Sequence, residues 1–292
     1  MQIITKGLTY TYSEKSKSLA VHAITDINLT IEEGDFFGIV GHTGSGKSTF
    51  IQHLNGLIKL AKNHGEIRIG EFDLGDKKCD FKALRSKVGM VFQHPEYQLF
   101  AETVEEDIAF GVKNFMSHLN SEEVKNAVRS AMEYVGLDYE KYKDKSPFSL
   151  SGGQKRRVAI AGVIATHPEV LVLDEPVAGL DPQGKREFIE LLKELKKRVV
   201  KTIIIVSHDM NLVAENCNKI AVFKEGKVFA VGSPKEVFSR AEEIKESGLE
   251  LPLTASLTKA LKDKGISIEN DFTEQGFASA LVQYFKGRGE GL

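Results

Sequence analysis

The sequence predicts an α/β fold built around a phosphate-binding loop, with a small helical region at its C-terminal end. A glycine-rich segment at residues 41–48 lies between a short apolar strand and a helix, and buried strands alternate with helices on both sides of a mainly helical stretch. The 292 residues suffice for one large or two moderate domains, and 41% apolar with 27% charged residues is an ordinary globular composition.

The N-terminal third is expected to be rich in strands. Residues 27–31 alternate apolar and polar side chains as a half-buried strand does, and residues 36–40 form an apolar strand that ends at the glycine-rich segment. Two more short strands are expected at residues 65–69 and 87–92.

The pattern turns helical between about residues 103 and 166. One helix is expected around 105–115, and a second starts with Ser121 as its N-cap and ends at Gly136. A third helix follows from Ser151.

Strands and helices alternate again in the last third. Apolar strands are expected at 170–173 and 202–206, on either side of a helix at 183–199 that Pro182 opens. A hairpin is expected at 219–231 around the turn at Glu225 and Gly226, and a short helix after Ser233 and Pro234. Two C-terminal helices are expected at 257–264 and 272–285, with a frayed end at 287–292.

The segment at residues 41–48 matches G-x-x-x-x-G-K-[ST]. Its glycines let successive backbone N–H groups point into one concavity, and the following helix adds its unpaired N-terminal donors. Lys47 is expected to reach the β- and γ-phosphates and take up developing charge, and the Ser48 hydroxyl to bind Mg²⁺. The nucleotide-binding residues predicted here are Gly41, His42, Thr43, Gly44, Ser45, Gly46, Lys47, Ser48 and Thr49.

Charge and hydropathy exclude several function classes. The net charge of −2 gives no basic field for nucleic acid, and no apolar run approaches the roughly 18 residues of a membrane span. The N-terminus lacks the features of a signal peptide, so we expect a cytosolic chain whose membrane contact is peripheral. Cys79 and Cys217 are far apart and fit reduced thiols rather than a zinc cluster.

A second helix with a glycine-rich N-terminus starts at residues 150–154, Leu-Ser-Gly-Gly-Gln. Such an N-terminus favours an anion, so the chain carries two candidate phosphate-binding helix ends. The two motifs in this order resemble the ABC (ATP-binding cassette) ATPases. That resemblance implies that two protomers meet head to tail, and that the nucleotide of one protomer is contacted by the partner copies of Ser151, Gly152, Gly153 and Gln154.

The resemblance also implies the catalytic residues. Asp174 ends the apolar strand 170–173, where the family holds Mg²⁺, and Glu175 after it corresponds to the general base. His208 follows the strand 202–206 as the switch histidine does, contacting the γ-phosphate. Gln93 matches the glutamine that senses the γ-phosphate and Mg²⁺ and joins the two lobes.

Two further positions follow from the same resemblance. Residues 178–181, ending in Asp181, resemble the loop that crosses the dimer seam. Tyr12 matches the aromatic side chain that stacks on adenine. Because residues two apart on a strand share a face, Tyr10 is the competing candidate.

These motifs cover residues 8–235 and imply the family's architecture, a P-loop NTPase with a RecA-like α/β core, an antiparallel β subdomain and a helical subdomain at about 95–166. The expected division is an ATP-binding domain at 1–244 and a C-terminal helical dimerisation extension at 245–292.

Within the family, residues 92–100 resemble the F-Q-x-P-x-x-Q-[LI]-F run of the ATPase subunits of energy-coupling factor (ECF) transporters. Residues 105–111 resemble that group as well, and residues 248–252 with the helices after them resemble its C-terminal dimerisation region. Residues 40–49 with 52–55 resemble the second of the two paralogous ATPases that such systems often carry. This implies an ATP- and Mg²⁺-dependent ATPase that energises uptake of vitamins or cobalt/nickel ions from the cytoplasmic face of the cell membrane. Its partners would be a second ATPase protomer, identical or paralogous, a transmembrane coupling subunit and a substrate-binding membrane subunit.

Other interpretations stay open at this point. The runner-up is the ATPase of another ABC importer class, and a soluble non-transport ABC ATPase or an ATP-regulated scaffold comes after it. Residues 97–100 are expected to lie partly in the core and partly in an apolar groove for the membrane partner, where charge at Tyr97 or Leu99 would weaken assembly.

Overall fold

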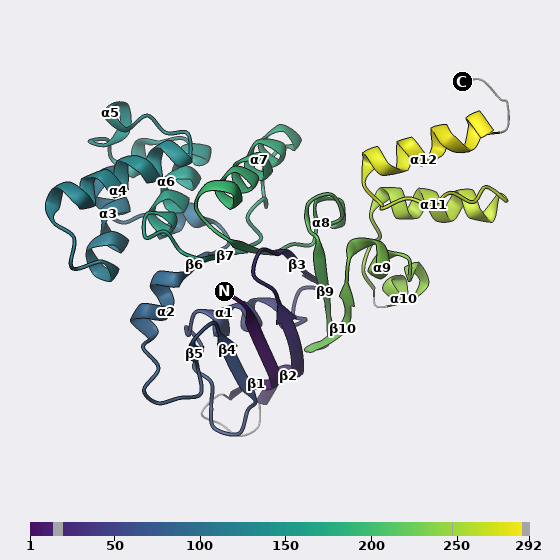
Figure 1. The fold of residues 1–292 in the computed structure, drawn as a ribbon, viewed down its shortest axis with the longest axis horizontal. Helices are drawn as coiled ribbons and strands as arrows, with labels where there is room; N and C mark the ends of the chain where they lie inside the picture. The colour runs from purple at the N-terminus through teal and green to yellow at the C-terminus, as the bar shows by residue number, and fades with distance from the viewer. Residues whose placement is uncertain (14–19, 247, 288–292) are drawn as a thin grey trace.

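The computed structural model describes residues 1–13, 20–246 and 248–287, and Figure 1 shows their arrangement. A six-stranded sheet has the order β10-β9-β3-β8-β7-β6, in which only β10 is antiparallel to its neighbour. Its strands are β3 (Phe36–Gly41), β6 (Val88–Val91), β7 (Val170–Asp174), β8 (Thr202–Val206), β9 (Lys219–Lys224) and β10 (Lys227–Gly232).

A second, antiparallel sheet has the order β2-β1-β4-β5 and lies below the first in Figure 1. Its strands are β1 (Ile3–Ser13), β2 (Ala20–Ile31), β4 (Glu66–Ile69) and β5 (Phe72–Asp73). Helices α1 (Lys47–Leu54) and α2 (Phe81–Lys87) connect the two sheets along the chain.

A helical subdomain projects on one side of the six-stranded sheet (Figure 1). It is built from η1 (Pro95–Gln98), α3 (Val104–Phe115), α4 (Ser121–Tyr134), α5 (Tyr139–Tyr142), η2 (Pro147–Ser149) and α6 (Gly152–Ile164). The expected helices at 105–115 and from Ser151 are thereby confirmed.

The C-terminal part continues with α7 (Pro182–Arg198), α8 (Met210–Asn216), α9 (Pro234–Phe238), α10 (Ala241–Glu246), α11 (Leu253–Asp263) and α12 (Glu274–Gly287). Helices α11 and α12 lie at the opposite end of the molecule from the helical subdomain (Figure 1). Helix α10 runs across the expected boundary between residues 244 and 245. Of the end expected to fray, 287–292, Gly287 is the last residue of α12 and the rest lies outside the described residues.

Strand β3 shows how the core is organised. Phe36 and Val40 belong to the first hydrophobic cluster, which includes the helical subdomain. Phe37 and Ile39 belong to the second hydrophobic cluster, which includes the antiparallel sheet. Because successive side chains of a strand point to opposite faces, a strand covered on both faces must be apolar throughout. This accounts for the uninterrupted apolar run before the glycine-rich segment.

The register of the parallel strands brings their carboxyl ends to one edge. Val206, the last residue of β8, lies opposite Ile39 of β3 and Asp174 of β7. Ligands of open α/β sheets bind outside the carboxyl ends of the strands. The loops that follow β3, β7 and β8 therefore meet at this edge.

Three expectations about helix ends were wrong. The N-cap of α4 is Asn120, because its side chain accepts the N–H groups of Glu122 and Glu123 and the Glu123 carboxylate accepts its own N–H. This reciprocal capping box makes Ser121 the first helical residue instead. The C-terminal helices begin at Leu253 and Glu274 rather than at 257 and 272.

Candidate active site

The phosphate loop connects a fully buried strand to a helix that begins at Lys47. Gly46, the residue before the helix, has a left-handed backbone with φ of 97°. A Cβ at this position would lie 2.4 Å from the carbonyl oxygen of Ala23, on the antiparallel sheet. Only glycine tolerates both the left-handed backbone and the close approach of this carbonyl oxygen, so Gly46 lets the loop pack against the antiparallel sheet.

A cavity of about 500 Å³ opens beside this loop, at the carboxyl edge of the six-stranded sheet. Its lining comes from both sheets and from the loops after β3, β6, β7 and β8. The lining residues are Tyr12, Val21, His22, Ala23, Thr43, Gly44, Gly46, Lys47, Ser48, Thr49, Gln93, Asp174, Glu175 and His208. Five separate segments of the sequence thus supply the predicted site residues to one cavity.

The Lys47 ammonium is held by the loop itself. Its Nζ donates to the carbonyl oxygens of Gly41 and His42, each at 2.7 Å. Burial lowers the pKa of Lys47, and the nearby charges of Glu175 and Asp174 oppose that shift. Gly41, His42 and Ser45 shape the back of the loop and do not line the cavity.

Two of the three predicted magnesium ligands, Ser48 and Asp174, contact each other, and the third, Gln93, lines the same cavity. The Ser48 hydroxyl hydrogen-bonds the Asp174 carboxylate, which is almost completely buried. Burial raises the pKa of Asp174, an effect that the Ser48 hydroxyl partly offsets. Within the described residues no group of three His, Cys, Asp or Glu side chains could hold a metal. One hydroxyl and one carboxylate suit Mg²⁺, which takes few protein ligands and completes its shell with water and substrate phosphates.

Glu175 and His208 form a pair at the cavity. The His208 Nδ1 lies 2.9 Å from Glu175 Oε2, so the ring donates to the carboxylate. Glu175 has a left-handed backbone with φ of 46°, and its N–H donates to the carbonyl of Val206 on β8. A glutamate in this region of φ is strained, and the neighbouring strand end fixes it there. The imidazole is 73% exposed, whereas the carboxylate is 15% exposed.

The two tyrosines of β1 occupy different environments. Tyr12 is exposed, lines the cavity and lies with its hydroxyl 3.3 Å from Thr49 Oγ1. Tyr10 packs edge-on against the buried ring of His53 and joins the second hydrophobic cluster. Tyr12 is thus the tyrosine with a ring face available beside the phosphate loop.

The signature segment lies apart from the cavity. Ser151 caps α6 through a capping box in which its hydroxyl accepts the Gln154 N–H and the Gln154 side chain accepts the Ser151 N–H. Ser151, Gly152 and Gly153 are exposed, and a Cβ on either glycine would meet nothing within 4 Å. None of residues 151–154 lines the cavity.

Asp181 also lies outside the cavity lining. It is the N-cap of α7, and its Oδ1 accepts the Gly184 N–H at 2.6 Å. The exposed residue at the expected seam therefore has a structural role within the chain.

Several cavity residues belong to no motif. Val21, His22 and Ala23 reach the cavity because β2 pairs with β1, which sets Val21 opposite Tyr12. Arg156 does not line the cavity but is also a residue that the sequence analysis did not predict. It is buried and donates to the carbonyls of Pro176 and Ala178 in the segment after Glu175. Its signal in the sequence was a charge four residues before Ile160, on the buried face of a helix.

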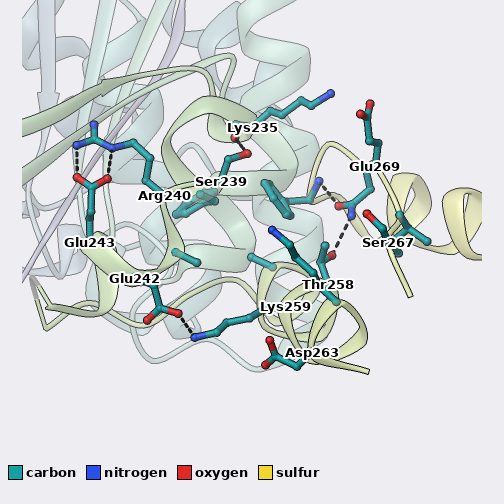
Figure 2. A pocket seen from close by; sticks show the side chains of 17 residues that line it. Lys235, Ser239, Arg240, Glu242, Glu243, Thr258, Lys259, Asp263, Ser267 and Glu269 are labelled. Carbon is teal, nitrogen blue, oxygen red and sulfur yellow. Dashed lines mark hydrogen bonds and ion pairs between the residues drawn. The ribbon is translucent and has the colours of Figure 1, made fainter. Parts of the chain in front are cut away.

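A larger cavity of about 730 Å³ lies between α9, α10 and α11, away from these loops, and Figure 2 shows its lining. It contains none of the motif residues. No helix in the described ranges is long and apolar enough to cross a bilayer.

The fold and the smaller cavity define the class, a P-loop protein that binds nucleotide at the carboxyl edge of its sheet. A model of the ABC transporter family matches residues 24–178. A relative from Clostridioides difficile, described as "Energy-coupling factor transporter ATP-binding protein EcfA2", is 49% identical over 291 residues and covers 99% of each chain. A relative of the same description from Enterococcus faecalis is 47% identical, also over 99% of each chain.

Solved structures agree with these relatives. The structure of cbiO1 from Clostridium perfringens, described as part of the ABC transporter complex cbiONQ, has a TM-score of 0.72 and 40% identity over 88% of this chain and 98% of its own. An ATP-binding cassette solved as a dimer bound to ADP and Pi has a TM-score of 0.68 and 30% identity, over 79% of this chain and 98% of its own. The chain therefore belongs to the ABC transporter family of ATPases, and within it to the energy-coupling factor transporter ATP-binding proteins of the EcfA2 type. Both resemblances drawn from the sequence are confirmed.

Proposed function

We propose that this chain is the ATP-hydrolysing subunit that energises an ECF-type importer, and that its hydrolytic site is completed by a second ATPase subunit, identical or paralogous. The observation that carries the proposal is the cavity in which Lys47, Ser48, Asp174, Glu175 and His208 meet, while Ser151 and the glycines after it face outward at another surface.

The phosphate loop binds the β- and γ-phosphates through its backbone N–H groups and the Lys47 ammonium. Ser48 and Asp174 would hold Mg²⁺, which supplies positive charge to the phosphate oxygens. The hydroxyl–carboxylate contact seen between Ser48 and Asp174 supports this assignment. Gln93, an exposed side chain at the cavity, would contact the γ-phosphate and Mg²⁺ from the loop after β6.

Glu175 acts as the general base. Its carboxylate accepts a proton from the attacking water, the water oxygen bonds to the γ-phosphorus, and the bond from that phosphorus to the bridging oxygen breaks, so that ADP and phosphate leave. The hydrogen bond from His208 fixes one carboxylate oxygen and leaves the other for water. His208 itself reaches the γ-phosphate from its exposed position.

The signature helix of the second subunit supplies what one subunit lacks. A phosphate loop alone leaves part of the γ-phosphate charge without a partner, and the N-terminus of the facing α6 provides further donors and the positive end of a dipole. Two ATP molecules then favour the closed dimer over the open one, which is the differential affinity that closure requires. Asp181 lies at the N-terminus of α7, where it would approach the seam.

The replacement Glu175→Gln tests the catalytic proposal. The amide keeps the size of the side chain but cannot take the proton, so we expect kcat to fall roughly 10³-fold while ATP still binds. Phosphate release from the assembled transporter measures kcat, and equilibrium binding of ATP is the control. Turnover at the wild-type rate in the variant would refute the base assignment.

Association with a membrane subunit is the second part of the proposal, and it places the chain at the cytoplasmic face of the membrane. An exposed aromatic patch supports it: Tyr97 is 83% exposed, and Phe100 and Phe110 contact each other edge to face at 4.9 Å while both remain over half exposed. Exposed apolar clusters commonly mark interaction surfaces.

The same region corrects one expectation. Leu99 is buried in the first hydrophobic cluster, so it belongs to the core and not to a groove. Leu99→Asp would unfold its surroundings and would not report on a partner. Tyr97→Asp is the better probe, because it leaves the core intact. We expect it to reduce co-purification of the membrane subunit without changing ATP binding, and unchanged co-purification would place the partner elsewhere.

A further inference from the structure

Helix α8 follows the switch histidine directly. Asp209 caps it, with Oδ1 accepting the Leu212 N–H at 3.1 Å, and the helix runs from Met210 to Asn216. Met210 and Val213 are buried in the first hydrophobic cluster, beneath the six-stranded sheet. Any movement of this helix therefore moves the segment that carries His208.

The outer face of α8 carries two polar residues, Asn211 and Glu215. Both are exposed, and their spacing of four residues places them on one side of the helix. Each accepts a backbone N–H from the first residue of a C-terminal helix. Asn211 Oδ1 accepts the Leu253 N–H of α11 at 2.8 Å, and the Glu215 carboxylate accepts the Glu274 N–H of α12.

The contact from Asn211 meets a need of α11, whereas at α12 the Thr273 hydroxyl already accepts the Gly276 N–H and Glu215 adds a second acceptor. The N-cap residue of α11 is Pro252, which has no polar side chain and makes no cap hydrogen bond. An uncapped helix leaves N-terminal N–H groups without partners, and Asn211 supplies the acceptor from another helix. At α12, the negative charge of Glu215 also lies at the positive end of the helix dipole.

The segment that leads into α11 touches the phosphate loop as well. Gly248 has a φ of 78°, and a Cβ there would lie 2.6 Å from Nε2 of His42. Leu249, Ala255 and Phe272 are buried in the same hydrophobic cluster as Met210 and Val213. The C-terminal extension thus approaches the phosphate loop at Gly248 and contacts the helix that follows His208 through Asn211 and Glu215.

The opposite side of the extension packs buried Ala255 and Phe272 near α9 and α10. There α11 faces α9 and α10 across the cavity of about 730 Å³. Figure 2 shows Lys259 of α11 paired with Glu242 of α10 at its rim, and the Glu242 side chain is 69% exposed. An exposed ion pair contributes little to rigidity. The contacts of the extension that reach the helix after the switch histidine are the two hydrogen bonds to α8.

We propose that Asn211 and Glu215 are positioning residues through which α11 and α12 set the place of His208, and through which the nucleotide state of the cavity is transmitted to the C-terminal extension. This rests on the proposed role of His208. The juxtaposition that carries it is the capping of two C-terminal helices by one face of the helix that follows the switch loop.

The test compares the assembled transporter with a variant in which Asn211→Ala and Glu215→Ala are combined. Hydrogen exchange of residues 253–263 and 274–287 is measured with Mg²⁺ and either ADP or a non-hydrolysable ATP analogue. In the wild type we expect exchange at the first turns of α11 and α12 to differ between the two nucleotides. In the double variant we expect the difference to vanish and exchange there to become about fivefold faster in both states.

Kinetics provide a second readout. Misplacement of His208 should lower kcat roughly threefold or more while KM for ATP changes less than about twofold. Asn211→Asp with Glu215→Gln retains an acceptor at both positions and should restore both readouts. The matched control is Lys259→Gln, which loosens the same extension at its other contact and should leave the nucleotide difference and kcat as in the wild type.

Each contrary result has a defined meaning. Exchange at α11 and α12 that does not respond to nucleotide in the wild type would overturn the proposal, as would a double variant with wild-type exchange and kcat. Equal losses in Lys259→Gln would do so too, because they would show a general loosening. The exchange measurement needs no hydrolysis, so it gives its answer even if Glu175→Gln shows that the catalytic assignment fails.

Discussion

The phosphate-loop cavity and the N-terminus of α6 are both glycine-rich helix starts, yet they differ in what surrounds them. In the cavity, functional groups are bonded within the chain: Lys47 to loop carbonyls, Ser48 to Asp174, and His208 to Glu175. At α6, the Ser151 side chain bonds the helix it caps, and the adjacent glycines face open space. One region is organised within the chain, and the other presents its donors outward.

The difference indicates what each region can do alone. Fixed donors in a partly enclosed cavity are suited to bind ATP, because little reorganisation is required. An exposed helix N-terminus binds an anion weakly in water, where its dipole is screened. Its donors gain strength only when another surface covers them.

Ser151→Arg should have the largest effect. The arginine fills the space in front of α6, so the facing nucleotide cannot approach, and we expect kcat of the assembled transporter to fall roughly 100-fold. ATP binding to the separate chain should not change. The matched control is Ser233→Arg, since Ser233 is also the N-cap of a capping box, at α9. If both variants lose turnover equally, the effect is loss of a cap and the comparison of the two regions fails.

Tyr12→Ala should have an intermediate effect. Loss of a stacking ring at the cavity should weaken ATP binding about tenfold. Tyr10→Ala is the comparison, because half-buried Tyr10 packs edge-on against His53 and also against the Tyr12 ring at 4.9 Å; it should lower stability more than affinity. Binding of a fluorescent ATP analogue and thermal unfolding measure the two quantities. A larger loss of affinity in Tyr10→Ala would reverse the assignment of the adenine platform.

Asp174→Asn should have the smallest effect, which is a change in stability. The substitution should stabilise the nucleotide-free chain. Burial raises the pKa of Asp174 in the folded chain, so its ionised form destabilises the fold at neutral pH. That penalty disappears as the pH falls through the raised pKa. We therefore expect the nucleotide-free variant to be more stable than the wild type by about 1 kcal/mol at pH 7, with a gap that narrows toward acid pH.

Denaturant unfolding at a series of pH values measures this difference. A wild-type chain that is more stable than Asp174→Asn at pH 7 would show that the Ser48 hydrogen bond and Lys47 outweigh the burial of the carboxylate.

The residues that the sequence could predict lie in contiguous motifs. Asp174 ends a strand, and Lys47 and His208 each follow one, so the sheet edge places them together once the strands are recognised. Val21 and His22 gave no such signal, because they reach the cavity through the pairing of β2 with β1. Register between distant segments is set by the whole sheet and cannot be derived from local spacing.

Helix ends show a second limit of prediction from the sequence. Asn120 and Ser121 are both good N-caps, and the choice falls to Asn120 because Glu123 stands at the third helical position after it. The sequence alone carries this signal, since the glutamate stands three residues after the asparagine. Helices α2, α8 and α10 have only seven, seven and six residues, too few for a period of 3.6 to be recognised. The burial of Leu99 beside exposed Tyr97 was likewise decided by packing of the helical subdomain.

ATP-dependent association of the Glu175→Gln chain tests the central claim most directly, namely that the exposed N-terminus of α6 completes the cavity of another subunit. Light scattering would follow this chain, alone and mixed with the sister ATPase subunit of its transporter, with and without Mg²⁺ and ATP. We predict that ATP produces a stable dimer and that adding Ser151→Arg abolishes the dimer while each chain still binds ATP. A chain that stays monomeric with ATP, alone and in the mixture, and a transporter that keeps full turnover with Ser151→Arg, would contradict the account.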